Sequence, residues 1–231
     1  MKKVLSGILK FFIYFLILYF ASTLFFVILY KFVNPPLTPL MVIRLAGQAY
    51  SGETVRLQND WAPIGDISPD MPLAVIASED NLFFEHKGFD FESIEKAREY
   101  NRLKQGKKMR GASTISQQTA KNVFLWPDRT WVRKGLETYF TVLIEFIWGK
   151  KRILEVYLNV IETGKGIYGV ESAAKLNFNK HAAKLSRGEA ALIAAILPNP
   201  LKWSPSSPTP YITGRQQWIL WNMNNIGKLS Y

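Results

Sequence analysis

The chain has 231 residues, of which 29 are Lys or Arg and 18 are Asp or Glu, giving a formal net charge of +11. It contains no cysteine, which excludes a disulfide framework, a Cys-ligated metal centre and a thiol nucleophile. Hydrophobic residues make up 48% of the sequence and charged residues 20%, a balance that excludes intrinsic disorder and predicts a folded domain.

The excess of positive charge is concentrated in one part of the chain. Between Lys96 and Arg152 there are 14 basic and 4 acidic residues, a net charge of +10. Such a concentration indicates nucleic acid, an anionic membrane surface or a phosphate-bearing ligand as the partner. No helix-turn-helix, RNP or zinc signature accompanies it, so nucleic acid is the least favoured of the three.

An apolar run near the N-terminus predicts a membrane-spanning helix. From Phe11 to Tyr30 there are 20 positions without Asp, Glu, Lys or Arg, and a helix of that length covers about 30 Å, the thickness of a bilayer core. A cleaved signal peptide is the competing interpretation. Its apolar region would be shorter and would end in a small-residue cleavage site, whereas this run continues into Lys31.

The charges that flank this run predict its orientation. Lys2, Lys3 and Lys10 precede it closely, and the positive-inside rule places such an end in the cytoplasm. We therefore expect residues 1–33 to form a short cytoplasmic N-terminus and a transmembrane anchor. Residues 34–231 are then expected to form one extracytoplasmic domain with a sizeable core.

The soluble part has the pattern of a mostly α-helical domain. The segment from Met41 to Ala49 and the turn-rich stretch to Asp70 show no strong period and are expected to wrap over the domain. Further on, apolar residues recur with helical spacing and β-alternation is lacking. The predicted helices cover residues 73–86, 90–104, 114–125, 129–148, 151–162, 170–178, 187–199 and, after a proline-rich loop braced by Trp203 and Tyr211, 215–225.

Glu79 is a candidate general base. It follows the apolar run Leu73 to Ser78 and precedes Leu82 and Phe83, so an apolar wall beside it would raise the pKa of its carboxyl group into the range that proton transfer near neutrality needs. The alternative is an exposed acid on a helix surface, and the spacing alone does not exclude it.

The segment around Thr114 has two interpretations. Thr114 and Gln117 fit a capping box, so the motif could serve only to begin a helix. A helix N-terminus also offers free backbone N–H groups to an anion, and Gln117 and Lys121 would share one face with Ser113 at the entrance, an arrangement suited to a phosphate. The spacing favours neither interpretation.

Arg133 and Glu137 are four residues apart on a predicted helix. They could form a surface ion pair that contributes about 0.3–0.5 kcal/mol. The functional alternative is a second carboxylate held among cations that face a diphosphate. Two separated carboxylates in a basic cleft are the minimum equipment for displacing a phosphate leaving group from a sugar.

Two further motifs are rejected. Residues 164–169 match G-x-G-x-x-G, but the preceding segment is predicted to be helical, whereas a dinucleotide site needs a strand there. Ser172 and Lys175 match S-x-x-K, but the chain has no K-T-G or S-D-N partner motif, so a penicillin-binding acyl-enzyme is not supported.

Taken together and in order, these motifs resemble the peptidoglycan glycosyltransferases of glycosyltransferase family 51, the lysozyme-like polymerases of lipid II. The resemblance is to the monofunctional biosynthetic transglycosylases, which carry a membrane anchor and this domain only. Asn179 departs from the family pattern, because a Gly commonly stands there. The matching blocks are residues 79–90, 111–122, 133–137, 150–159 and 164–171.

The resemblance implies a role for each matching residue. Glu79 would be the base that removes the proton from the acceptor 4-hydroxyl, and Glu137 would assist on the donor side, near the departing diphosphate. The cations implied to neutralise that diphosphate are Lys121, Arg129, Arg133 and Lys134. The residues implied to bind donor and acceptor are Asp80, Phe83, Ser113, Gln117, Gln118 and Asn122.

The resemblance also implies a setting in the cell. The domain would lie on the periplasmic side of the bacterial inner membrane, with lipid II, the growing glycan strand and membrane lipid as partners, and with penicillin-binding transpeptidases and division proteins nearby. No metal-ligand cluster is evident, so a divalent cation such as Mg²⁺ or Mn²⁺ would arrive with the diphosphate. The alternatives are a lysozyme-like enzyme that cleaves glycan strands and a non-catalytic membrane-anchored scaffold.

Overall fold

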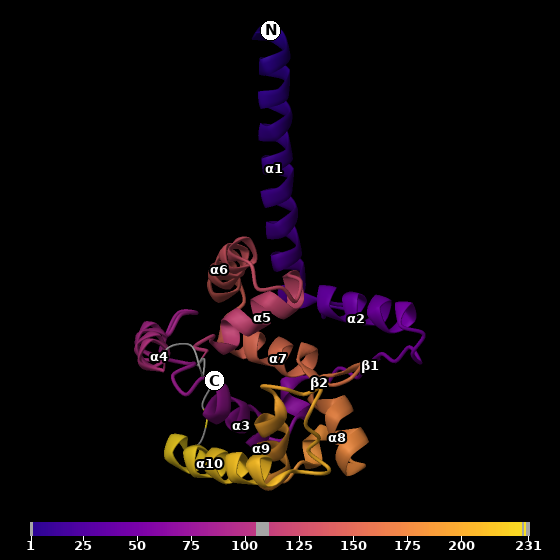
Figure 1. Ribbon diagram of the computed structural model, residues 1–231, viewed down its shortest axis with the longest axis vertical. Coiled ribbons are helices and arrows are strands. Elements are labelled where there is room, and N and C mark those ends of the chain that lie inside the picture. Colours follow the sequence, from indigo (N-terminus) through magenta and orange to yellow (C-terminus); the bar gives the residue numbers. More distant parts are fainter. Residues whose placement is uncertain (1, 105–110, 228, 230–231) are drawn as a thin grey trace.

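A single long helix, α1 (Lys2–Phe32), projects from a body built of shorter helices (Figure 1). The computed structural model describes residues 2–104, 111–227 and 229, and it describes side chains from Ser6 onward. The prediction of a mostly α-helical chain with an apolar N-terminal helix is confirmed, because α1 contains an apolar stretch, Ser6–Phe32, that is long enough to cross a membrane.

The body contains nine further α-helices among the described residues, two short 3-10 helices (Ile64–Asp66 and Ala182–Lys184) and a small sheet. The helices are α2 (Pro39–Tyr50), α3 (Asp70–Glu79), α4 (Phe91–Leu103), α5 (Ile115–Phe124), α6 (Trp131–Ile147), α7 (Lys150–Val160), α8 (Val170–Phe178), α9 (Arg187–Ile196) and α10 (Pro210–Ile226). The strands are β1 (Gln58–Asn59), β2 (Glu162–Gly164) and β3 (Ile167–Tyr168), with β3 central, parallel to β1 and antiparallel to β2. Strands of two or three residues are too short to show a period of two, so the sequence did not predict them.

The C-terminal half of α1 is packed against the body. The Thr23 and Tyr139 hydroxyls lie 2.8 Å apart, and the indole Nε1 of Trp148 donates to the Val27 carbonyl at 2.7 Å. Val27 has no exposed surface, whereas most apolar side chains nearer the N-terminus of α1 are exposed. Helix α1 is therefore fixed to α6 and to Trp148, which directly follows α6.

Three predicted boundaries are corrected by the structure. Residues 41–49 show no strong period in the sequence but belong to α2, which begins because Thr38 accepts a hydrogen bond from the Met41 N–H and Pro39 stands in the first turn. The last helix begins at Pro210, behind Thr209, and not at residue 215. The helix predicted to continue to residue 86 ends at Glu79, and turns follow.

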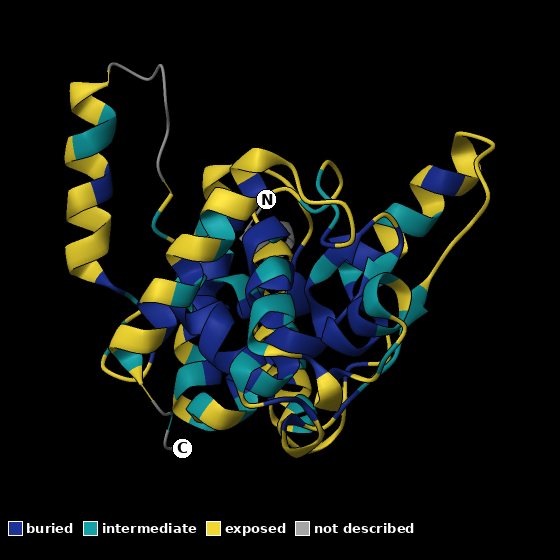
Figure 2. Ribbon diagram, turned by 90° about the horizontal axis from the view of Figure 1, so that it is seen from below, coloured by how far each residue is buried: buried dark blue, intermediate teal, exposed yellow. Residues whose placement is uncertain are grey.

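The core lies where α3, α5, α7 and α9 meet. Figure 2 shows the buried residues at the centre of the body, with the largely exposed helices α2 and α4 projecting on opposite sides. On α3, every residue from Met71 to Ala77 is buried, and on α7, Leu154, Tyr157 and Leu158 have no exposed surface. Because α3 and α7 sit inside the body, residues at their ends are held rigidly.

The glycines of the rejected dinucleotide motif shape the small sheet. Gly169 has φ +78°, and a Cβ placed there would lie 2.8 Å from the Asn159 carbonyl oxygen. The S-x-x-K residues are also structural, because Ser172 accepts a hydrogen bond from the Asp60 N–H and Lys175 pairs with Asp60. Asn179 adopts the left-handed conformation, φ 52°, which explains why a Gly is suited to that position.

We expect Gly169→Ala to lower the free energy of unfolding by about 2 kcal/mol or more, because a left-handed Ala is strained and its Cβ meets a backbone carbonyl. The matched control is Gly214→Ala, since Gly214 lies within α10 and a Cβ added there would meet no other atom within 4 Å. That change should stabilise by about 0.5–1 kcal/mol. Thermal and denaturant unfolding of the detergent-solubilised protein measures both. Equal effects of the two substitutions would contradict the packing described at Gly169.

Candidate active site

The start of α5 is fixed by two side chains. Thr114 and Gln117 form the predicted capping box, in which the Thr114 side chain accepts from the Gln117 N–H and the Gln117 side chain accepts from the Thr114 N–H. Asp80, at the end of α3, accepts from the Ile115 N–H at 2.9 Å. The capping interpretation is thus confirmed, and the N–H groups of Ile115 and Gln117 are not open to a phosphate.

Asp80 has both carboxylate oxygens engaged within the protein. Oδ2 accepts from Ile115, and Oδ1 lies 2.8 Å from Nε2 of His86. The side chain is almost fully buried. Asp80 thus joins the end of α3 to the start of α5, and its binding of substrate stays a prediction.

Glu79 lies beside this junction with its carboxylate held by three polar groups. Nε2 of Gln118 donates to Oε2 at 3.2 Å, while the Ser78 hydroxyl at 3.0 Å and Nη2 of Arg215 at 3.4 Å contact Oε1. The side chain is 15% exposed. Its immediate partners are polar groups, where an apolar wall was expected, and the carboxylate is held in one orientation while still reaching solvent.

Tyr157 on α7 determines which end of the Gln118 amide faces Glu79. Its hydroxyl donates to Oε1 of Gln118 at 3.2 Å, which leaves the amide nitrogen for Glu79. Burial, reinforced by the negative charge of Glu79, raises the pKa of the Tyr157 hydroxyl well above its usual value. Tyr157 therefore stays protonated and acts as a donor to Gln118.

Arg215 is a site residue that the sequence did not reveal. It lies on α10, 136 residues from Glu79, and it carries no local motif. Its Nη2 contacts Ser78 and Glu79, while its Nε is buried without a hydrogen-bond partner. Only the packing of α10 against α3 brings this cation to the carboxylate.

A second cluster joins α5 and α6 around Glu137. The Glu137 carboxylate is 3% exposed, and its two oxygens pair with Arg133 and Lys134. Burial lowers the pKa of the nearby Lys121, the charges of Arg133 and Lys134 lower it further, and the charge of Glu137 opposes the shift. Three cations thus surround one carboxylate, and we call these four residues the cation cluster.

Two features of the cation cluster are typical of an anion-binding site. Its net positive charge is not balanced by Glu137 alone, and Nε of Arg133 is buried without a hydrogen-bond partner. A buried donor of this kind costs free energy unless something accepts from it. An anion with several oxygens would satisfy both the charge and the donor.

A family model described as Transglycosylase matches residues 47–224, which is most of the chain. The chain belongs to the transglycosylase family. A protein of Bacteroides thetaiotaomicron named biosynthetic peptidoglycan transglycosylase is 57% identical over 213 residues, covering 92% of this chain and 85% of the relative. Proteins of the same name from Bdellovibrio bacteriovorus and Pseudomonas entomophila are 56% and 49% identical, covering 88% and 91% of this chain and 81% and 89% of the relatives.

The other predicted site residues of this transglycosylase fall into two groups. Ser113 is exposed and, with Gln117 and Lys134, lines a cavity of about 460 Å³ whose opposite wall is α4. Arg129 is exposed in the connection between α5 and α6. These positions are open to a ligand, although Gln117 itself is buried and committed to the capping box.

Phe83 and Asn122 are placed inside the protein. Phe83 has no exposed surface, and Nζ of Lys150 lies 4.5 Å from its ring centroid. Phe83 thus has a packing position in the core, and its contact with substrate stays a prediction. Asn122 is buried on α5, one residue after Lys121. Arg110, which directly precedes the matching block 111–122, lies outside the described residues.

We expect inorganic pyrophosphate to bind the cation cluster with a pH dependence set by Lys121. Because the pKa of Lys121 is lowered, this side chain is protonated below that pKa and loses its charge as the pH rises, before an ordinary lysine would. Affinity should therefore fall on the alkaline side, by about tenfold or more for one lost charge-assisted contact. Calorimetric titration across pH measures this.

The Lys121→Arg variant supplies the comparison for that titration. An arginine stays charged, so its pyrophosphate affinity should persist to higher pH than that of the unchanged protein. Lys202→Arg, at an exposed position outside the cluster, should leave the profile unchanged. A Lys121→Arg profile identical to that of the unchanged protein would exclude Lys121 as the titrating group.

Proposed function

We propose that this transglycosylase is a peptidoglycan glycosyltransferase, which polymerises lipid II into linear β-1,4 glycan strands with inversion and releases undecaprenyl diphosphate. The observation that carries the proposal is that one helix, α5, contributes residues both to the surroundings of Glu79 and to the cation cluster. Gln118 of α5 holds the Glu79 carboxylate, and Lys121, one turn further, belongs to the cation cluster. The rise of about 1.5 Å per residue puts these two positions about 4.5 Å apart along the axis.

In the proposed reaction, Glu79 takes the proton from the 4-hydroxyl of the acceptor GlcNAc. The oxygen attacks the anomeric carbon of the donor MurNAc, and the bond from that carbon to the diphosphate oxygen breaks with its electron pair going to the diphosphate. Because attack and departure occur on opposite faces, an α-linked donor gives a β-linked product in one displacement. No covalent sugar–enzyme intermediate is involved.

The cation cluster receives the leaving group in this mechanism. Lys121, Arg133 and Lys134 stabilise the charge that develops on the diphosphate, with Arg129 near the entrance. Glu137 has both oxygens paired with cations, so its proposed role is to hold Arg133 and Lys134 in place and not to accept a proton. Ser113, Gln118 and the cavity against α4 would position the sugars.

A divalent cation such as Mg²⁺ or Mn²⁺ would enter this site with the diphosphate. Within the described ranges, no three His, Asp or Glu side chains gather as a metal site, and the carboxylate of the cation cluster is already paired with two cations. Such an ion would supply further neutralisation of the leaving group. The cations of the chain itself perform that task in the mechanism above.

The cation cluster also distinguishes this function from glycan cleavage. A lysozyme-like enzyme that hydrolyses finished strands has one proton-transfer carboxylate but no diphosphate to neutralise, so it gains nothing from three cations around a buried Glu137. The apolar helix α1 supports the same choice, because a lipid-linked substrate stays in a membrane. We propose a cytoplasmic N-terminus, a catalytic domain in the periplasm beside the bacterial inner membrane, and transpeptidases and division proteins as neighbours.

Glu79→Gln should reduce the rate of glycan formation from purified lipid II by about 10²–10⁴-fold, because an amide cannot accept the hydroxyl proton. The melting temperature should change little, since the amide fits the same space. Gel analysis of labelled polymer and thermal unfolding measure the two effects. Glu53→Gln, at a half-exposed carboxylate paired with Lys165, is the control that should retain activity. Full activity of the Glu79 variant would exclude the proposed base.

Glu137→Gln should also reduce polymerisation strongly, because Arg133 and Lys134 lose the carboxylate that holds them. Breaking a buried ion pair costs about 3–5 kcal/mol in stability, so folding must be separated from chemistry. Glu171→Gln is matched for this purpose, since Glu171 is a buried carboxylate paired with Lys175 and His181 away from the site. It should lose stability but keep its activity per folded molecule. Substantial turnover by the Glu137 variant would show that the ion pairs of Glu137 serve only the stability of the fold.

A further inference from the structure

Exposed aromatic side chains lie in a row along α10. Tyr211, Trp218 and Trp221 are 61%, 48% and 62% exposed, although tryptophan is on average highly buried in folded proteins. The period of about 3.6 residues places the three within about 80° of one another around the helix axis and spreads them over about 15 Å along it. We call these three residues the aromatic stripe. Its length and its exposure are typical of a surface that binds an extended ligand.

The aromatic stripe begins beside the proposed base. Arg215, whose Nη2 lies 3.4 Å from the Glu79 carboxylate, comes four residues after Tyr211 and three before Trp218. Residues with these spacings are neighbours on a helix surface, so the two aromatic side chains flank the cation that contacts Glu79. The indole of Trp203, in the loop before α10, extends this end of the stripe, because its ring centroid lies 5.4 Å from that of Tyr211. The stripe therefore adjoins the site around Glu79.

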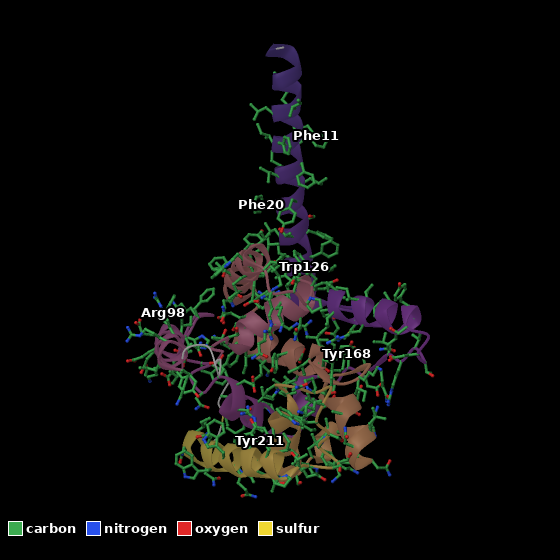
Figure 3. The ribbon with its side chains drawn as sticks, in the orientation of Figure 1. Phe11, Phe20, Arg98, Trp126, Tyr168 and Tyr211 are labelled. Atoms are coloured by element: carbon green, nitrogen blue, oxygen red, sulfur yellow. The ribbon has the colours of Figure 1, made fainter. Side chains whose placement is uncertain are left out.

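The aromatic stripe lies far from the apolar N-terminal helix. Figure 1 shows α10 at the end of the body opposite α1, and Figure 3 shows Tyr211 at that end, whereas Phe20 lies on α1 beyond the other. The stretch of α1 that is long enough to cross a membrane is on the far side of the body. Lipid around α1 therefore does not reach the stripe.

The chemistry of this surface fits an uncharged carbohydrate. Arg215 is the single charged residue of α10, and the exposed polar side chains beside the aromatic rings include the amides of Gln217 and Asn225. The face of an aromatic ring is negative and attracts the C–H groups on one face of a sugar, while amides donate to and accept from sugar hydroxyls. A phosphate-bearing ligand would instead need several cations.

We propose that the aromatic stripe binds the growing glycan strand, an inference that rests on the proposed function. In the proposed reaction, the diphosphate at the end of the strand lies on the cation cluster and the reacting carbon lies near Glu79. The sugars joined earlier extend from that carbon, and α10 lies beyond Glu79 on the side away from α1. These sugars stack on Tyr211, Trp218 and Trp221 in turn.

Binding at the stripe acts on the length of the strand more than on the chemical step. The aromatic rings contact sugars that are already joined and touch no reacting atom, so they hold the strand between one addition and the next. The first coupling joins two lipid II molecules, and its donor carries only two sugars. Loss of the stripe therefore affects the extension of long strands more than the first coupling.

The test is the double variant Trp218→Ala, Trp221→Ala of the full-length protein in nanodiscs, supplied with labelled lipid II. Lost contacts act mainly through faster dissociation, so the mean strand length on gels should fall by about tenfold relative to the rate of the first coupling. The control is Tyr50→Ala, at an exposed aromatic side chain at the end of α2, which should leave the strand length unchanged. Unchanged strand length in a double variant with a normal melting temperature would exclude the stripe.

Two further double variants separate sugar stacking from apolar contact with another protein. Phenylalanine at positions 218 and 221 keeps a flat aromatic face, so Trp218→Phe, Trp221→Phe should restore much of the strand length. Trp218→Leu, Trp221→Leu keeps apolar bulk without such a face and should not restore it. Equal recovery with leucine and phenylalanine would contradict the inference.

A binding measurement tests the stripe independently of catalysis. Soluble strands of alternating GlcNAc and MurNAc, which carry no diphosphate, are titrated calorimetrically into the full-length protein. The double alanine variant should bind them about tenfold more weakly than the unchanged protein, and equal affinities would overturn the inference. If the unchanged protein forms no polymer from lipid II, the proposed function fails, and this titration still decides whether the stripe binds glycan.

Discussion

The carboxylate of Asp80 is the constraint on which the site depends. One oxygen accepts from the first N–H of α5 and the other contacts His86, so the end of α3 is joined to the start of α5. Glu79 directly precedes Asp80, and Gln118 lies in the first turn of α5. The relative position of the Glu79 carboxylate and its Gln118 amide partner is thus determined by the neighbouring Asp80 carboxylate. A buried hydrogen bond to a charged group is short and costly to break, which suits it to this task.

Helix α5 then arranges the remaining chemistry along its length. Gln118 faces the Glu79 carboxylate, Lys121 joins the cation cluster, and Phe124 lines an apolar groove at the base of α1. The proposed base, the cation cluster and the apolar groove therefore follow one another along α5 from the interior of the domain toward the base of α1 (Figure 1). The packing of α1 against α6 keeps this order fixed relative to α1.

Much of the fold followed from local patterns. The apolar run of α1, the helical periods of α4 to α9, the capping box at Thr114 and the i, i+4 spacing of Arg133 and Glu137 are short-range features, and the structure contains all of them. The errors arose where a cap decided the boundary of a helix, as at Thr38 and Thr209. The sequence also did not show that the side chains of Asp80 and Phe83 are engaged inside the protein. A motif reports which residues a fold needs. It does not separate those that support the site from those that face the ligand.

The sequence by itself determined the class of the protein: a membrane-associated, mostly helical transglycosylase with a carboxylate motif and a block of positive charge. Helix periodicity, caps and apolar length act over a few residues, so they can be recognised without coordinates. Tertiary structure alone decided that Arg215 contacts Glu79, that Tyr157 orients Gln118, and that α1 and α2 enclose a groove beside the cations. Each of these contacts joins segments far apart in the chain, and only the packing of the helices around α3 and α7 determines which of them meet.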